Sequence, residues 1–421
     1  MNVSVKQKIF IWQVTQSDKK KFVVLCILSE SVHPYYSKKA VSYTMLLPAD
    51  FRVFMLFRVI MITKRIDQGR ADSMKEPVNQ NIFLSGNEWR IRKAIRVYRR
   101  IFCRGDRMKL IVINKLSADK AADIAAAVPG SSVECYASTA EAVPHAAEAD
   151  AVATWGFMPV DRLLAAGPHI RWVHSLSDGV EALLCPALVN GNILLTNSHG
   201  IHDKPVAEHV MSMILAWSRA LPVFIRQQEQ HSWKRARTDS VYGKSIAIIG
   251  FGGIGRAVAE RAKAFGMKVY AVKRRRSDEL FADRVYSTGE ISDVLPLADY
   301  VVCALPATKD TEGYFQAEHF KAMKKTAFFI NIARGSIIDE TALVHALQKK
   351  EIAGAGLDVF SKEPLPPDHP LWSMENVILT PHTGSMVPDF WPKLLKLLKD
   401  NFVSFAAGSP LMNIVDKTKG Y

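Results

Sequence analysis

A glycine-rich turn between two apolar runs constrains the fold of this chain more than any other stretch. The segment SIAIIGFGGIGRAVAERAKAFGMKVYAV predicts a buried strand over 245–249, an amphipathic helix over 254–265 and a second strand over 268–272. Gly250, Gly252 and Gly255 stand between strand and helix in G-x-G-x-x-G spacing. That spacing permits a tight turn, a backbone that approaches a pyrophosphate, and close helix–strand packing. A dinucleotide-binding turn is therefore favoured over a glycine-rich turn without a ligand.

Four consecutive cations, Lys273 to Arg276, follow the second strand. At this place dinucleotide-binding folds often carry an acid that bonds the ribose hydroxyl of NAD, whereas an arginine accommodates the extra phosphate of NADP. Lys273 stands about where that acid would be, and Arg274 and Arg275 follow it. Guanidinium groups suit a phosphate dianion. We expect NADP as the cofactor, with NAD as the alternative; a solvated run of surface charge is the competing interpretation.

Polar side chains end the apolar segments that follow in the sequence. The segments ADYVVCALP, TAFFINIARG, IAGAGLDVF and NVILTPH predict further strands of an α/β sheet. Ligands bind at the carboxyl ends of the strands in such sheets. Those ends carry Pro306, Arg334, Asp358, Glu363 and His382.

Three of these residues form a workable set for reducing a 2-oxo acid with a hydride from a nicotinamide. Arg334 can bind a carboxylate with two hydrogen bonds and polarise the adjacent carbonyl. His382 can donate a proton to the carbonyl oxygen, and can take it back in the oxidative direction. Glu363 would favour the protonated form of the imidazole. Each residue alone is also explained by a structural role, so the expectation depends on their joint placement.

Residues 108–421 resemble the D-isomer specific 2-hydroxyacid dehydrogenase family. The resemblance is carried by GFGGIG, NIARGSIIDETAL, GAGLDVFSKEPLP and LTPHTGS. It implies that Arg334, Glu363 and His382 are catalytic, that Asp358 lies near the nicotinamide carboxamide, and that Pro306 lies beside the adenosine. It also implies a homodimer paired through the nucleotide domain.

The same resemblance implies an α/β architecture of two Rossmann-like doubly wound domains. The substrate domain would comprise 108–206 and 387–421, and it would be interrupted by the dinucleotide-binding domain over 207–386. The expected cofactor-binding residues are Gly250, Gly252, Gly253, Ile254, Gly255, Lys273, Arg274, Arg275, Pro306, Ala333 and Asp358. No metal site is expected.

The substrate loops match the family more loosely. Trp155, Gly156, Leu176 and Ser177 are candidates by position, together with Arg334, in the segments ATWGFMP and HSLSDGVEA. Trp155 would narrow the pocket toward small substrates such as glyoxylate or hydroxypyruvate, although an indole can equally stack on a larger group.

Two helices flank these loops in the expected fold. A long hinge helix is expected from the segment AEHV to residue 220, with His209 in a packing or inter-domain role. The returning C-terminal helix is expected to begin at Pro392. Phe390 or Trp391 would close the pocket or pack at the dimer interface.

Residues 1–107 differ in character from the rest of the chain. They hold 21 Lys and Arg against 8 Asp and Glu, whereas residues 108–421 hold 34 against 33. They show no sustained hydrophobic period, and Arg104 to Arg107 can be encoded by a purine-rich stretch that resembles a ribosome-binding site. We expect an extension that is not a folded domain, with Met108 as the true start. A basic arm for nucleic acid or an anionic membrane is the alternative.

Two classes of function remain open. The first is an enzyme, an NADPH-preferring 2-oxo acid reductase that acts on a small-molecule substrate, with no nucleic-acid or membrane partner. The second is a dinucleotide-sensing binding protein of the same fold with little turnover. The five widely spaced cysteines favour a reducing compartment, and we expect a cytoplasmic location.

Overall fold

The structure is a computed structural model that describes the backbone of residues 5–15, 21–31, 40–46 and 108–421, and the side chains of 108–421. The first three segments are strands β1 (Val5–Thr15), β2 (Lys21–Ser31) and β3 (Ala40–Leu46), which pair in an antiparallel sheet. This sheet was not predicted from the sequence. The predictions of a leader and of a basic arm concern mainly residues outside the described ones, and they stay predictions.

The substrate domain is built on a five-stranded parallel sheet in the order β5-β4-β6-β7-β8. Its strands are β4 (Lys109–Ile113), β5 (Ser132–Tyr136), β6 (Ala151–Thr154), β7 (Trp172–Ser175) and β8 (Leu194–Thr196). Its helices are α2 (Ala118–Ala126), α3 (Thr139–Ala142), α4 (Asp161–Ala166) and α5 (Pro186–Asn190). Strands β4, β6 and β7 are buried along their whole length, as expected for a sheet covered on both faces.

The dinucleotide-binding domain is built on a seven-stranded parallel sheet in the order β11-β10-β9-β12-β13-β14-β15. Its strands are β9 (Ser245–Ile249), β10 (Lys268–Lys273), β11 (Arg284–Ser287), β12 (Tyr300–Cys303), β13 (Phe328–Asn331), β14 (Gly354–Leu357) and β15 (Val377–Leu379). Its helices are α8 (Gly253–Ala264), α9 (Ile291–Val294), α10 (Ala317–Ala322) and α11 (Glu340–Gln348). The strand order reverses between β9 and β12, and ligands bind at such switch points.

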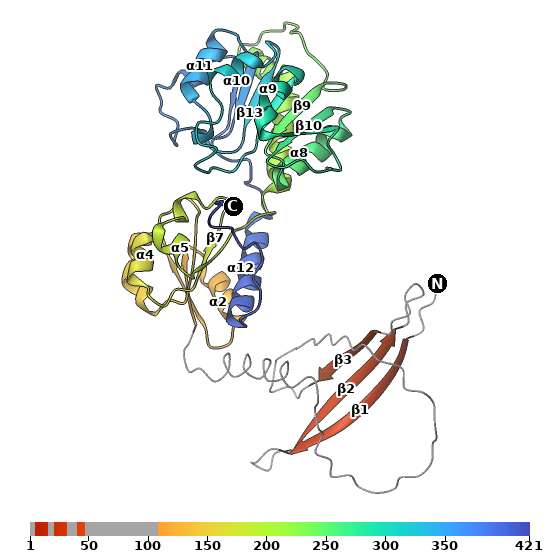
Figure 1. The fold of residues 1–421 in the computed structure, drawn as a ribbon, viewed down its shortest axis with the longest axis vertical. Helices are drawn as coiled ribbons and strands as arrows, with labels where there is room; N and C mark the ends of the chain where they lie inside the picture. The colour runs from red at the N-terminus through yellow and green to blue at the C-terminus, as the bar shows by residue number, and fades with distance from the viewer. Residues whose placement is uncertain (1–4, 16–20, 32–39, 47–107) are drawn as a thin grey trace. The chain divides into compact units, whose positions relative to one another are not determined.

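Three further helices connect or flank the two sheets. Helix α6 (Asp203–Ser218) buries one face against α8 in the core of the dinucleotide-binding domain, and Ala220 in the left-handed conformation separates it from α7 (Leu221–Glu229). Helix α12 (Phe390–Ala406) returns to the substrate domain, where it lies beside α2 (Figure 1). Short 3-10 helices lie at Val143–Glu148, Glu181–Leu183, Thr288–Glu290, Leu295–Leu297, Gly335–Ile337 and Pro370–Ser373.

Two helix boundaries differ from the expected ones. Helix α6 begins at Asp203 and ends at Ser218, and α12 begins at Phe390, two residues before Pro392. In both helices a proline lies in the first turn, where backbone N–H groups have no intrahelical partner. The proline therefore does not mark the first residue. The expected domain limit at 206/207 falls inside α6, whose buried face belongs to the dinucleotide-binding core from Val206 onward.

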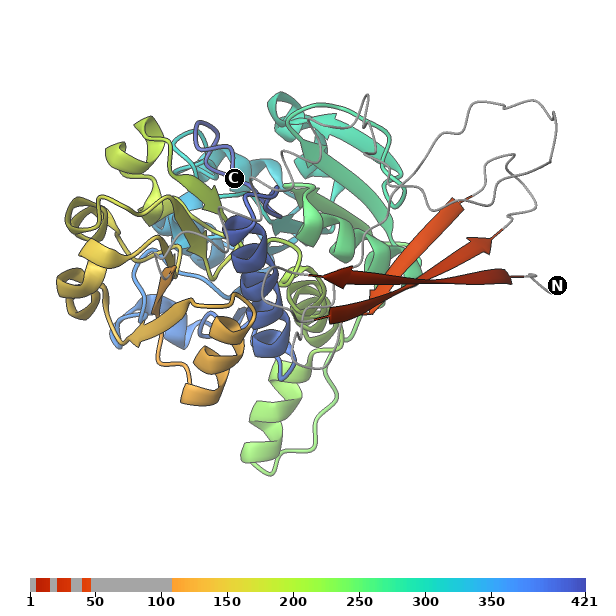
Figure 2. The same cartoon turned by 90° about the horizontal axis from the view of Figure 1, so that it is seen from below.

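The predicted fold class of two Rossmann-like doubly wound sheets is confirmed. Helix α7 has no buried residue, and Figure 2 shows it in light green, projecting from the neighbouring helices. Within the described segments, no helix combines the length and the apolar character needed to cross a membrane.

Candidate active site

The glycine turn lies at the switch point of the seven-stranded sheet. Gly250 has a φ of 103°, and a Cβ there would lie 2.3 Å from the carbonyl oxygen of Ala304. A Cβ on Gly255 would lie 2.4 Å from the carbonyl oxygen of Gly250. By contrast, a Cβ on Gly252 would meet no other atom within 4 Å, so packing within the chain does not require glycine there. This open side, next to the first N–H groups of α8, fits a pyrophosphate.

The next two residues of the turn contact the hinge helix and the core. A Cβ on Gly253 would lie 2.2 Å from Oδ2 of Asp203, in the first turn of α6. Ile254 is half-buried against the core that α6 and α8 share. Burial raises the pKa of the Asp203 carboxyl, and its Oδ1 is buried with no hydrogen-bond partner among the described residues. Asp203 is a neighbour of the turn that the sequence analysis missed.

Arg334 follows β13 and reaches the substrate domain. Its carbonyl accepts from Nδ2 of Asn331 at 3.1 Å, and its Nη1 donates to the carbonyl of Ala333 at 2.8 Å. Its Nε lies 2.5 Å from Oε1 of Glu181, the first residue of the 3-10 helix that follows β7. A Cβ on Gly179 would lie 2.3 Å from Nη2 of the same guanidinium. The arginine predicted to bind the substrate carboxylate is therefore fixed against a predicted substrate loop.

Gly335 brings the arginine turn against the backbone before Glu363. A Cβ on Gly335 would lie 1.9 Å from the carbonyl carbon of Phe360, so only glycine fits. The N–H of Phe360 donates to Oε1 of Glu363 at 3.0 Å. The close backbone approach thus sets the spacing between the two turns that carry Arg334 and Glu363.

Glu363 and His382 form a hydrogen-bonded pair. Oε2 of Glu363 lies 2.8 Å from Nδ1 of His382. Partial burial works against ionisation of Glu363, but hydrogen bonds from His382 and from the N–H of Phe360 outweigh it and lower the pKa of the carboxyl. A carboxylate only accepts, so Nδ1 carries the proton and Nε2 is the nitrogen left to exchange a proton with a ligand. His382 also has a φ of 53°, fixed by its N–H bond to the carbonyl of Asp358 at 2.9 Å.

Asp358 is a buried acceptor rather than a free base. Its Oδ1 accepts from Oγ1 of Thr380 at 2.6 Å and from the N–H of Thr383 at 2.9 Å, and its Oδ2 accepts from the N–H of Gly384 at 3.0 Å. Burial opposes ionisation, yet the bonds from His209, Thr380 and the two N–H groups lower the pKa of Asp358.

His209 links the hinge helix to the turn after β15. Its Nε2 lies 2.9 Å from Oγ1 of Thr380 and 3.4 Å from Oδ1 of Asp358. These polar contacts are compatible with the packing or inter-domain role expected for His209, which stays a prediction. The place of Asp358 beside the nicotinamide stays a prediction. The cofactor-binding roles of Pro306, which is exposed after β12, and of Ala333, which is buried after β13, also stay predictions.

The two substrate loops meet each other. The N–H of Gly156 donates to Oγ of Ser177 at 2.9 Å, and a Cβ on Gly156 would lie 1.8 Å from the carbonyl oxygen of Gly179. The side chain of Leu176 is buried, and its N–H already donates to the carbonyl of Thr154 at 2.8 Å. Gly156 and Ser177 are therefore next to the Arg334 contact, whereas Leu176 has the weaker support as a substrate ligand.

Aromatic side chains gather around Trp155. Its ring centroid lies 6.1 Å from that of Phe157 and 6.0 Å from that of Trp391, in the first turn of α12. Trp391 contacts Phe390, and Phe390 lies 5.3 Å from the ring of His202. Phe390 and Trp391 thus pack within the chain, beside a candidate substrate residue.

A second imidazole, that of His202, lies near the site. No role was predicted for it from the sequence. It is 8% exposed, and its Nε2 has no hydrogen-bond partner among the described residues. Burial lowers the pKa of His202; the negative charge of Asp178 opposes this effect, and the positive charge of Arg334 adds to it. A buried neutral imidazole is the expected state. The sequence signal that could have found it is its place in the segment SHGIHDKP, shortly before the expected hinge helix.

The four cations after β10 have different partners. Lys273 pairs with Glu279, which also accepts two hydrogen bonds from Arg256, and Arg276 pairs with Glu290. Arg274 instead lies over an aromatic ring, its Cζ 5.0 Å from the centroid of Tyr421. A pocket is lined by Lys273, Arg274, Arg275, Ser277, Lys419 and Tyr421.

The acid that holds Lys273 was not foreseen. Hydrogen bonds from Arg256, and then from Lys273, lower the pKa of Glu279 to about 2, against the effect of burial. Lys273 thus lines the pocket with its charge partly balanced, whereas Arg274 and Arg275 form no ion pair with an acidic side chain among residues 108–421.

Comparison with known proteins connects this geometry to a family. The model of the D-isomer specific 2-hydroxyacid dehydrogenase NAD-binding domain matches residues 211–384. The glyoxylate reductase of Pyrococcus furiosus is 34% identical over 262 residues, which span 59% of this chain and 77% of the relative. Glyoxylate/hydroxypyruvate reductase B of Escherichia fergusonii is 35% identical over 265 residues, 61% of this chain and 81% of the relative.

The chain belongs to the D-isomer specific 2-hydroxyacid dehydrogenase family. Solved structures agree. A family member from Aeromonas salmonicida is 32% identical, with a TM-score of 0.66 over 74% of this chain and all of that one. An NADPH-dependent glyoxylate/hydroxypyruvate reductase from Sinorhizobium meliloti, in complex with NADP and sulfate, is 27% identical, with a TM-score of 0.66 over 75% of this chain and all of that one.

Membership of the 2-hydroxyacid dehydrogenase family confirms the predicted class of enzyme. The chain is an oxidoreductase with a nicotinamide-dinucleotide-binding domain. The glycine turn, the N-terminus of α8 and the cations after β10 are the residues that would hold this cofactor, and their open side and positive charge fit it.

Proposed function

We propose that this enzyme uses NADPH in preference to NADH to reduce a small 2-oxo acid, glyoxylate or hydroxypyruvate, to the corresponding 2-hydroxy acid, with D configuration where the product is chiral. The 2.8 Å hydrogen bond between His382 and Glu363 carries the proposal, because it prepares an imidazole for proton transfer. The relatives named as glyoxylate and hydroxypyruvate reductases support the choice of substrate.

The residues divide the chemistry between them. When bound, the reduced nicotinamide supplies the hydride that adds to the carbonyl carbon. Nε2 of His382 donates a proton to the carbonyl oxygen, which becomes the hydroxyl of the product, and Glu363 stabilises the imidazolium before transfer. Arg334, oriented by Glu181, binds the carboxylate and draws electron density from the adjacent carbonyl. Gly156 and Ser177 complete the carboxylate side of the site.

The preference for NADPH depends on Arg274 and Arg275. Lys273 and Arg276 each have an acidic partner. The guanidinium groups of Arg274 and Arg275 are therefore the better candidates for binding the extra phosphate of NADP. Arg274→Ala should therefore weaken NADPH binding far more than NADH binding. Lys273→Ala should have the smaller effect on the ratio of the NADPH and NADH dissociation constants. Equal losses of NADPH and NADH binding would mean that these cations are only surface charge.

The proposed reaction is tested by NADPH oxidation with the purified full chain. The panel is glyoxylate, hydroxypyruvate, pyruvate and aromatic 2-oxo acids. We expect turnover that is highest with the small acids and with NADPH. His382→Gln should lose turnover while keeping its NADPH dissociation constant. Tight NADPH binding without turnover across the panel would overturn the reductase in favour of a dinucleotide-sensing protein.

We also propose a homodimer formed through the dinucleotide-binding domain. Helix α7 and the segment after it expose Leu221, Ile225, Trp233 and Tyr242, and Trp233 is 100% exposed. Apolar side chains gathered on a projecting segment are typical of a protein interface. Light scattering after size exclusion should give twice the chain mass for the wild type and a smaller mass for the double variant Ile225→Glu/Trp233→Glu. A wild-type monomer would contradict the dimer.

We place the enzyme in the cytoplasm as a proposal. Cys185 and Cys303 are buried free thiols, which suit a reducing compartment.

A further inference from the structure

The last six residues of the chain, Asp416–Tyr421, form a compact turn that we call the strap. The N–H groups of Lys419 and Gly420 donate to the carbonyl of Asp416 at 3.0 and 2.8 Å, and the N–H of Asp416 donates to the carbonyl of Tyr421 at 3.2 Å. The Asp416 side chain accepts from Thr418 and pairs with Lys419. These bonds close the strap into a turn in which Lys419 and Tyr421 line the same pocket.

The strap is anchored to the substrate domain. Nζ of Lys417 donates to the carbonyls of Leu188, Gly191 and Ile193, at 2.8, 2.8 and 3.1 Å. These carbonyls end α5 and precede β8. The residue before the strap, Val415, is buried, and its N–H donates to the carbonyl of Leu195 in β8 at 2.9 Å.

The far side of the strap touches the dinucleotide-binding domain at two loops. A Cβ on Gly420 would lie 3.4 Å from Leu184 of the substrate domain and 3.6 Å from Thr308, in the loop after β12. The ring of Tyr421 lies under the guanidinium of Arg274, in the loop after β10. These loops are the ones that flank the adenosine in the proposed cofactor site.

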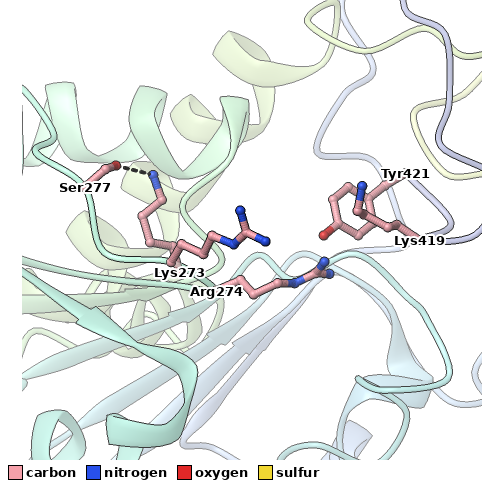
Figure 3. A pocket seen from close by; sticks show the side chains of 6 residues that line it. Lys273, Arg274, Ser277, Lys419 and Tyr421 are labelled. Atoms are coloured by element: carbon pink, nitrogen blue, oxygen red, sulfur yellow. Dashed lines mark hydrogen bonds between the residues drawn. The ribbon is translucent and has the colours of Figure 1, made fainter.

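Lys419 and Tyr421 share a pocket of about 370 Å³ with Lys273, Arg274, Arg275 and Ser277. Figure 3 shows Arg274 extended toward Tyr421, with Lys419 beside that ring, while Lys273 turns to Ser277. The side chains of the lining therefore include four cations and no carboxylate. A ring stacked on a guanidinium orients it and leaves the N–H groups at its edge free to donate.

We propose that the strap is part of the binding site for the 2′-phosphate of NADP, with Tyr421 orienting Arg274 and Lys419 adding a charge from the substrate domain. This inference rests on the proposed preference for NADPH. The ion pair of Lys419 with Asp416 is exposed, with side chains 54% and 39% accessible, so it competes weakly with a phosphate dianion. Cofactor choice then depends on residues of both domains.

Direct binding measurements on the full chain test the strap. Dissociation constants are measured by fluorescence for NADPH, NADH, 2′,5′-ADP and 5′-AMP, so turnover is not needed. Tyr421→Ala should raise the constants for NADPH and 2′,5′-ADP about two- to fivefold, the range expected for losing a cation–π contact at an exposed site. The constants for NADH and 5′-AMP should not change. Tyr421→Phe retains the ring and should behave as the wild type.

Lys419 is tested beside a charge-matched control. Lys419→Ala should raise the NADPH constant about two- to fivefold at low salt, and the effect should shrink as salt screens the charge. Lys396→Ala is the control, because it removes one charge from an exposed ion pair on α12. It should change neither the NADPH nor the NADH dissociation constant.

The outcomes separate the two proposals. A wild type that binds NADPH no more tightly than NADH would overturn the proposed preference and this inference with it. If the wild type prefers NADPH and Arg274→Ala lowers that preference, but both strap variants bind as the wild type does, only the inference fails. Equal weakening of NADPH and NADH, or tighter NADPH binding by Tyr421→Ala, would also overturn it.

Discussion

Nδ1 of His382 lies 2.8 Å from Oε2 of Glu363, and the N–H of Phe360 holds the other carboxylate oxygen at 3.0 Å. The pair is therefore fixed from both sides. Because the hydrogen bonds lower the pKa of Glu363, the carboxylate is ionised at neutral pH and accepts the proton carried by Nδ1.

Glu363→Gln should remove that charge while keeping a side chain of similar size. We expect kcat for reduction to fall about 100-fold or more, within the range for general acid catalysis. Steady-state kinetics in the reductive direction, together with an NADPH dissociation constant that stays at the wild-type value, give this result. An unchanged kcat would mean that Glu363 is structural only.

Glu181→Gln should loosen Arg334. The 2.5 Å contact between Nε and Oε1 orients the guanidinium beside Gly179. We expect KM for the 2-oxo acid to rise roughly three- to tenfold, about the effect of losing one hydrogen bond between charged groups at a partly exposed site. The NADPH dissociation constant should not change. Glu208→Gln, which breaks an exposed pair with Arg261, is the matched control and should leave KM unchanged.

Glu279→Gln should destabilise the protein in a pH-dependent way. The pKa of Glu279 is lowered from an ordinary value of 4.5 to about 2, so its ionic contribution is complete above about pH 4.5 and is lost as pH falls toward 2. Urea unfolding at a series of pH values should show the largest difference from wild type near pH 7. The difference should begin to shrink below about pH 4.5. A constant difference between pH 7 and pH 4 would rule out this ionic contribution.

Trp155→Ala should widen the range of substrates. The indole packs against Phe157 and Trp391 next to Gly156, so removing it opens the candidate pocket. The ratio of kcat/KM for an aromatic 2-oxo acid to that for glyoxylate should rise about tenfold or more, the scale of discrimination by pocket shape. Trp372→Ala, at an exposed tryptophan after β14, is the control. A ratio that falls would show that the indole stacks on larger substrates.

Local sequence patterns predicted much of the dinucleotide-binding domain. The strand over 245–249 agrees with β9, and the predicted helix over 254–265 is displaced by one residue from α8. Alternating apolar runs and glycines determine these elements over short distances. Residues at the ends of parallel strands meet at one edge of a sheet, so the positions of Arg334, Glu363 and His382 could also be predicted.

Contacts between distant segments could not be predicted in the same way. The partner of Arg334 is Glu181, 153 positions away, and the ring beside Arg274 belongs to the last residue. Hydrophobic periodicity gives no information on such pairs. The pairing of Lys273 with Glu279 spans six positions, but it depends on how the loop after β10 turns. The partner of each cation in the run from Lys273 to Arg276 could therefore be assigned only from the structure.

The most direct test of the central claim is steady-state oxidation of NADPH and NADH by the full chain with glyoxylate and hydroxypyruvate. Wild type and His382→Gln are compared at matched cofactor occupancy. We expect turnover by wild type that favours NADPH, and a loss of about 100-fold or more in kcat for the variant with unchanged NADPH binding. Equal kcat in the two proteins, or no turnover by wild type with cofactor bound, would contradict it.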